Sequence, residues 1–161
     1  MVQTKTAKNA GRRVNGKHVK ELLAEYKQMR WVHNSDRIGK ADSLSVWYGI
    51  DELQDFINTA RQSGANGIKM YFGVYSKENA SDIKYEGRQT IVLVASKTGI
   101  QADGSSIEKS VFHGGELVAF NFGRLCPPNC TNTDSETNDS GFDIDNPGIL
   151  IDRKDGGMIV V

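Results

Sequence analysis

The residues best suited to chemistry gather in a short loop that follows a strand-like segment. Cys126 and Cys130 stand four positions apart around Pro127-Pro128. Prolines restrict the backbone, so this loop is more rigid than its neighbours. Its thiols form a local disulfide if their Cα atoms come within about 7 Å, but in a cytoplasmic protein, which the sequence predicts, we expect them to be free. Alternatively, Cys126 is the nucleophile of an enzyme, with His113 as its base and Arg124 lowering its pKa.

The simplest interpretation of this loop is a structural turn whose cysteines carry no chemistry. Cys126, Cys130 and His113 are also weak candidates for metal ligands. Zinc takes four ligands, and the chain has only two cysteines and three histidines. We therefore expect neither a metal nor a cofactor. A downstream acidic stretch does not fit a calcium-binding loop in any register and is interpreted as solvated; it comprises Asp134, Glu136, Asp139, Asp143 and Asp145.

Aromatic residues on predicted strands offer a second candidate site, for a small molecule or a protein partner. If they share a face outside the core, they line a ligand pocket or a partner surface. The usual role of aromatic residues on strands is core packing, which is the competing interpretation. The candidate ligand-binding residues are Trp47, Tyr48, Tyr71, Tyr75 and Asn121.

No strong catalytic or nucleotide-binding motif is present. The chain lacks a phosphate-binding glycine loop, GxGxxG after a strand, HExxH and GxSxG. The favoured function is therefore a small non-catalytic binding or interaction module, which includes pairing with a second copy. The first alternative is an enzyme of hydrolase or thiol type that uses Cys126, Cys130 and His113. The second is a nucleic-acid-associated protein that uses the basic N-terminus.

Composition sets the outer limits on class and location. The 161 residues carry a formal net charge of zero and are 25% charged. This balance argues against a protein built mainly to hold nucleic acid or an anionic membrane. No apolar run is long enough to span a bilayer, and no signal peptide is visible, so the sequence predicts a cytoplasmic protein without a membrane partner. We expect a flexible basic arm at 1–14 and a single domain at 15–161.

The central stretch, residues 45–75, supplies the clearest local structure. Its middle part predicts an amphipathic helix that begins after Gly49 and ends near Gly64, with Ile50, Phe56 and Ile57 on its apolar face. A strand at 68–75 should follow, because apolar and polar residues alternate along it. If the strand at 45–48 pairs with it in parallel, the crossover through the helix should be right-handed.

The remaining elements complete an α+β prediction. A first helix should run from about Gly16 to Arg30, capped by Asn15, with a polar connection at 31–44. Further strands are expected at 90–96, 110–113 and 117–122, with a loop at 98–110 and a hairpin turn at Gly114-Gly115. An irregular Asn/Asp/Gly-rich segment at 126–148 should follow, and then a terminal hairpin. We predict two amphipathic helices on one side of a sheet of about five strands that is mainly antiparallel or mixed.

Deletion of residues 1–14 should leave the melting temperature of the chain unchanged, because this polar arm has little apolar surface to bury. Thermal unfolding of the full and shortened chains checks this. A fall of several degrees would show that the arm is part of the fold. If the nucleic-acid alternative holds, the full chain should bind DNA or RNA in a salt-sensitive way, and the deletion should abolish that binding.

Overall fold

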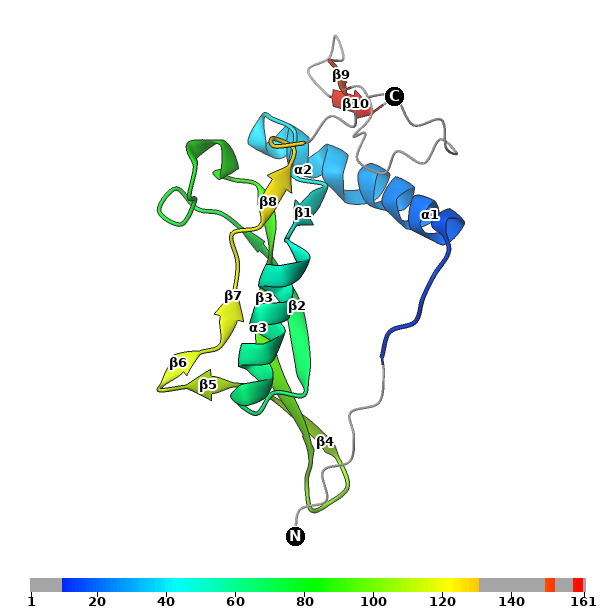
Figure 1. The fold of residues 1–161 in the computed structure, drawn as a ribbon. Helices are drawn as coiled ribbons and strands as arrows, with labels where there is room; N and C mark the ends of the chain where they lie inside the picture. The colour runs from blue at the N-terminus through cyan, green and yellow to red at the C-terminus, as the bar shows by residue number, and fades with distance from the viewer. Residues whose placement is uncertain (1–9, 131–149, 153–157, 161) are drawn as a thin grey trace. The chain divides into compact units, whose positions relative to one another are not determined.

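The computed structural model describes residues 10–130 and the backbone of residues 150–152 and 158–160. Helices and antiparallel strands are both present, which confirms the α+β class in its content of secondary structure (Figure 1). The residues group into two compact units, and each is described by itself. Of the residues in 10–130, unit 1 holds 10–12, 48–73 and 91–122, and unit 2 holds the rest. The single domain over 15–161 stays a prediction, and most of the irregular segment lies outside the described residues.

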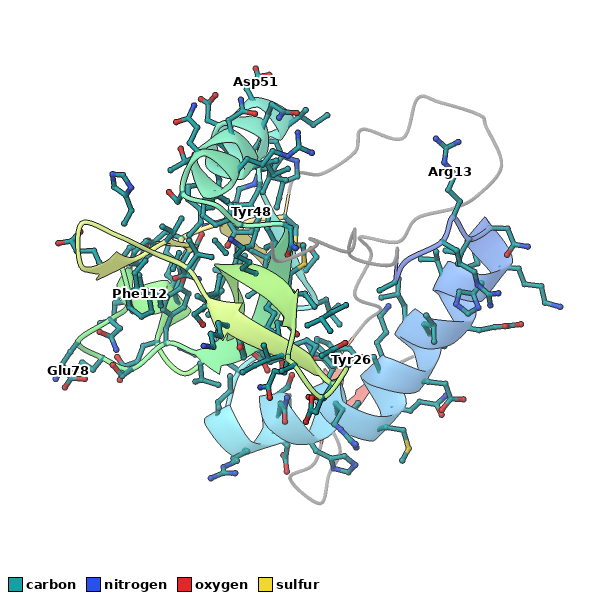
Figure 2. All side chains as sticks on the ribbon, turned by 90° about the horizontal axis from the view of Figure 1, so that it is seen from below. Arg13, Tyr26, Tyr48, Asp51, Glu78 and Phe112 are labelled. Carbon is teal, nitrogen blue, oxygen red and sulfur yellow. A yellow bond between two sulfur atoms is a disulfide. The ribbon has the colours of Figure 1, made fainter. Side chains whose placement is uncertain are left out.

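Helix α3 (Ile50–Gln62) is the central helix of unit 1 and confirms the strongest local prediction. Its first turn is capped by Glu52, whose carboxylate accepts a hydrogen bond of 2.5 Å from the Gly49 N–H. Asp51 beside it points away from the helix (Figure 2). Gly64 follows the helix with a φ of +90°, a left-handed conformation that glycine adopts without steric cost.

The apolar stripe of α3 begins one turn later than the sequence indicated. Phe56 is 6% exposed and packs in the core of unit 1, whereas Ile50 is 85% exposed. Ile50 is the first residue of the helix, where no strand covers it, so its place in the predicted stripe is wrong. Ile57, expected to be buried, is half-buried. The core is a set of six buried residues; these are Phe56, Ala60, Leu93, Ala95, Val111 and Val118.

The main sheet has the strand order β2 (Gly67–Val74), β3 (Gln89–Ile100) and β4 (Ser106–Ser110), and β7 (Ala119–Phe120) also pairs with β3. β3 extends past its predicted end and forms a hairpin with β4 around a turn that contains Gly104. The predicted loop at 98–110 is therefore mostly strand. The segment has the polar composition that is typical of a loop, because neither face of this hairpin is buried. That both helices lie on one side of one sheet stays a prediction.

The predicted strand at 117–122 is divided at Val118 by a backbone junction. Ala95 N donates to Val118 O at 2.9 Å, Val111 N donates to Ala95 O at 2.9 Å, and Val118 N donates to Val111 O at 3.0 Å. Beyond this junction, β5 (Phe112–His113) pairs with β6 (Glu116–Leu117). The Gly114-Gly115 turn between them is confirmed, with φ of +58° and +85°.

Strand β2 does not bury the apolar face that its alternation predicted. Ile68 packs against the core, but Met70, Phe72 and Val74 are 66%, 79% and 69% exposed. The prediction fails because alternation shows only which residues share a face and not whether another element covers that face. β2 also lies at the edge of its sheet.

The first helical run, in unit 2, is longer than predicted. It comprises α1 (Gly16–Tyr26), a π-helical turn (Lys27–Trp31) and α2 (Val32–Ile38). The cap is as predicted, since the Asn15 side chain accepts from His18 N at 3.0 Å. The prediction of a polar connection from 31 onward is wrong. Trp31 is fully buried and donates its indole N–H to Asp42 O at 2.7 Å, which holds the run against the following loop.

A buried carboxylate organises the rest of unit 2. Asp42 is 3% exposed, and its Oδ1 accepts from Ser43 N at 2.8 Å and from Gln89 N at 2.7 Å. Burial lowers the pKa of Arg88, an effect that Asp42 opposes. Burial and the Asp42 charge both raise the pKa of Tyr26, against a lowering by its hydrogen bond to Gln89. The carboxylate thus ties the loop after α2 to the start of β3.

Strand β1 (Ser45–Trp47) pairs antiparallel with β8 (Arg124–Cys126) and not in parallel with 68–75, so the condition for a right-handed crossover is not met. Tyr75, Tyr85 and Leu125 form the core beside this pair, and Tyr85 ends a 3₁₀ turn (Ile83–Tyr85). The predicted terminal hairpin is present as β9 (Leu150–Asp152) and β10 (Met158–Val160). Among the residues described, no helix is long and apolar enough to cross a bilayer.

Phe56→Ala should lower the free energy of unfolding by about 3–5 kcal/mol, because it opens a cavity beneath α3. Ile50→Ala is the matched control on the same helix and should cost no more than about 0.5 kcal/mol, since Ile50 is 85% exposed. Urea unfolding followed by circular dichroism measures both. Equal losses for the two variants would contradict the assignment of Phe56 to the core.

Candidate functional site

The cysteine loop is closed by a disulfide. Cys126 and Cys130 are bonded, with their Cα atoms 4.7 Å apart, which differs from our expectation of free thiols. Asn129 fastens the loop to unit 2, because its N donates to Leu125 O at 2.9 Å and its Nδ2 donates to the Tyr85 hydroxyl at 2.7 Å. A sulfur held in a disulfide is not a nucleophile. Disulfides are also more typical of oxidising compartments than of the cytoplasm.

The partners predicted for Cys126 do not form a thiol–imidazole site within either unit. His113 belongs to unit 1, whereas Cys126 and Arg124 belong to unit 2. The guanidinium of Arg124 lies 4.5 Å from the centroid of the exposed Trp47 ring, a cation–π contact at the surface of unit 2. Within the described ranges, no three His, Cys, Asp or Glu side chains gather where they could hold a metal ion.

The aromatic candidates have different roles in the structure. The Tyr48 hydroxyl and the Asn121 amide both donate to Ile91 O, at 2.9 and 2.8 Å, so both hold their segments against β3. Tyr75 is 4% exposed, packs in the core of unit 2 and accepts from Thr90. Trp47 and Tyr71 are exposed, but they belong to different units. These five residues do not line one pocket within either unit.

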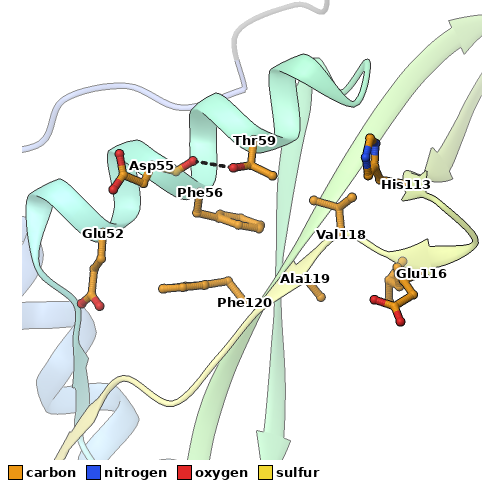
Figure 3. A pocket seen from close by; sticks show the side chains of 10 residues that line it. Glu52, Asp55, Phe56, Thr59, His113, Glu116, Val118, Ala119 and Phe120 are labelled. Atoms are coloured by element: carbon orange, nitrogen blue, oxygen red, sulfur yellow. Dashed lines mark hydrogen bonds between the residues drawn. The ribbon is translucent and has the colours of Figure 1, made fainter.

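Unit 1 instead contains an open groove of about 550 Å³ between α3 and the β5–β7 segment (Figure 3). Four lining residues come from one face of the helix at spacings of three and four, and the others come from the hairpin and from β7. The lining residues are Glu52, Asp55, Phe56, Thr59, His113, Glu116, Leu117, Val118, Ala119 and Phe120.

The floor of the groove is aromatic and rigidly packed. The rings of Phe56 and Phe120 stack with centroids 5.2 Å apart and an interplanar angle of 22°. The Tyr48 ring packs against the Phe120 ring, with the two ring centroids 5.5 Å apart. The pairing of Phe120 with Leu93 fixes its backbone on the sheet. This floor is therefore held by both the helix and the sheet, and it forms the apolar part of the groove lining.

The rim of the groove is acidic. Glu52 and Asp55 stand on the helix side, and His113 and Glu116 stand on the hairpin side (Figure 3). Glu52 already caps α3, and the Thr59 hydroxyl donates to the Asp55 backbone carbonyl at 3.0 Å. No lysine or arginine is among the lining residues. This combination of an apolar floor and a negative rim suits a ligand that carries both an apolar group and a positive charge.

Sequence reasoning missed most of this groove. It identified His113, but assigned it to a thiol site, and it did not single out Asp55, Thr59 or Glu116. A signal was present, because Glu52, Asp55, Phe56 and Thr59 follow helical spacing and mix acidic with apolar side chains on one face. The hairpin of the second wall was predicted, but the division of the strand at Val118, which separates this hairpin from the main sheet, was not.

Comparison with known proteins does not extend this assignment: the chain matches no family model, no curated protein and no solved structure.

The purified chain should show no free thiol until it is reduced, because both cysteines are in the disulfide. Replacing both cysteines by serine should destabilise the chain by about 2 kcal/mol, the chain-entropy estimate for a loop of about five residues. Maleimide labelling and urea unfolding measure these two quantities. Labelling of Cys126 in the native, unreduced protein would restore the thiol-enzyme hypothesis.

Proposed function

We propose that this chain is a non-catalytic binding module whose unit 1 groove holds a cationic, partly apolar ligand, such as a lysine- or arginine-bearing peptide segment. The observation that carries the proposal is the groove itself, with a stacked Phe56–Phe120 floor beneath a rim of carboxylates. An aliphatic or aromatic group would lie on the floor, and an ammonium or guanidinium group would face Asp55 and Glu116.

The arrangement of polar groups favours binding over catalysis. A catalytic base needs a partner that orients it and a nucleophile or substrate within hydrogen-bond reach. In the part of the chain that the structure describes, the His113 imidazole makes no hydrogen bond or ion pair, and its backbone pairs with Glu116 on an exposed hairpin. His113 is better suited to a polar contact with a ligand at the rim of the groove.

Neither alternative gains comparable support. The thiol enzyme would need Cys126 free of its disulfide and a base in unit 2. Nucleic acid would need a basic surface, whereas the groove is acidic and repels phosphate. The basic arm at 1–14 stays a candidate for nucleic acid, although only its last residues, including Arg12 and Arg13, are described. A cytoplasmic location likewise stays a prediction.

Calorimetric titration with a short capped peptide, rich in lysine around a central phenylalanine, tests the proposal. Binding should be measurable at low ionic strength and weaken on addition of salt, because exposed charges are screened. The peptide with glutamate in place of lysine should not bind. Asp55→Asn combined with Glu116→Gln should weaken binding of the lysine peptide about fivefold, since each exposed ion pair contributes modestly.

Glu78→Gln combined with Glu25→Gln is the matched control for this double variant, because it also removes two charges, both from exposed carboxylates of unit 2. Neither of them lines the groove, and Glu78 is labelled in Figure 2. The control removes charge without touching the groove and should bind the lysine peptide like the unaltered chain. Equal binding of the lysine and glutamate peptides, or equal weakening by the control and the double variant, would refute the groove as a cation site.

A further inference from the structure

Strand β2 has an unusually open edge. It is eight residues long and pairs with β3 on one side, while no other strand of the described part pairs with its second side. The backbone N–H and C=O groups of alternate residues on such an edge have no partner from the sheet. Folded proteins commonly protect edges of this kind with prolines, charges, bulges or a covering element.

The side chains of β2 do not supply that protection. The strand contains no proline, and Lys69 is its only charged residue. The Lys69 ammonium lies 3.2 Å from the Glu108 carboxylate of the same sheet, so its charge is largely compensated. Met70 and Phe72 continue the row of Ile68 and are 66% and 79% exposed. An open hydrogen-bonding edge thus coincides with an uncovered apolar row.

The sequence of β2 matches itself when two copies run antiparallel. With Tyr71 opposite Tyr71 of the second copy, Met70 faces Phe72, Ile68 faces Val74 and Lys69 faces Gly73. Each large apolar residue then has an apolar partner, and no charged residue faces a like charge. A two-fold pairing of this type is closed, so it ends at a dimer.

We propose that β2 is a homodimerisation edge, at which two copies of the chain join their sheets antiparallel about Tyr71. The backbone hydrogen bonds of the joined edges provide most of the geometric specificity, and the paired Met70 and Phe72 side chains bury apolar surface. This surface is separate from the residues that line the groove.

Sedimentation equilibrium of the full chain tests the proposal. The unaltered chain should be a dimer at low-micromolar concentration. Phe72→Lys should raise the dissociation constant of the dimer about tenfold or more, because it introduces one lysine from each copy beside the paired strands. Ile83→Lys is the matched control, since Ile83 is 80% exposed on the 3₁₀ turn of unit 2. Circular dichroism of both variants verifies that neither has unfolded.

Disulfide trapping tests the register. Tyr71→Cys should form an intermolecular disulfide on mild oxidation, because equivalent residues meet at the two-fold axis within disulfide range. Lys69→Cys is the control and should not, since it faces Gly73 of the other copy. A monomeric unaltered chain, an equal effect of Phe72→Lys and Ile83→Lys, or equal trapping at positions 69 and 71 would overturn the proposal.

Discussion

The groove of unit 1 depends on the backbone junction formed by Ala95, Val111 and Val118. Each of these three residues donates a hydrogen bond to another of them, and all three are buried. The chain enters the junction at Val111 and returns at Val118, so residues 112–117 are excluded from the main sheet. They form the β5–β6 hairpin instead, which places His113 and Glu116 opposite α3. The junction therefore separates the hairpin wall of the groove from the main sheet.

The two units are stabilised by different combinations of interactions. Unit 1 uses apolar packing, with Phe56 and Phe120 between helix and sheet. Unit 2 combines its apolar core of Tyr75, Tyr85 and Leu125 with buried polar groups. Asp42 accepts two backbone hydrogen bonds there, and Trp31 donates to the Asp42 carbonyl. Buried polar groups are favourable only when their hydrogen bonds are made, so these bonds specify the geometry of unit 2 as well as contributing to its stability. In unit 1, the exposed carboxylates of the groove remain available to a ligand.

Local features of the fold were predictable where the signal lies within a few residues. The Gly49 and Gly64 ends of α3, the Asn15 cap and the Gly114-Gly115 turn all rest on short-range chemistry. The pairing of Ser45–Trp47 with Arg124–Cys126 was not predictable, because these segments are far apart in the sequence and each is compatible with other partners. The groove was missed for the same reason. Phe56 was a predictable core residue, but its contact with Phe120 depends on long-range strand pairing.

The central proposal is that the unit 1 groove binds cationic, partly apolar ligands. Backbone amide chemical shifts during titration with the lysine–phenylalanine peptide test it directly. The predicted result is a set of saturable shift changes at Asp55, Thr59, His113, Glu116 and Val118, which line both walls of the groove. Changes that spread evenly over the exposed carboxylates of both units, or that avoid these five residues, would contradict the account.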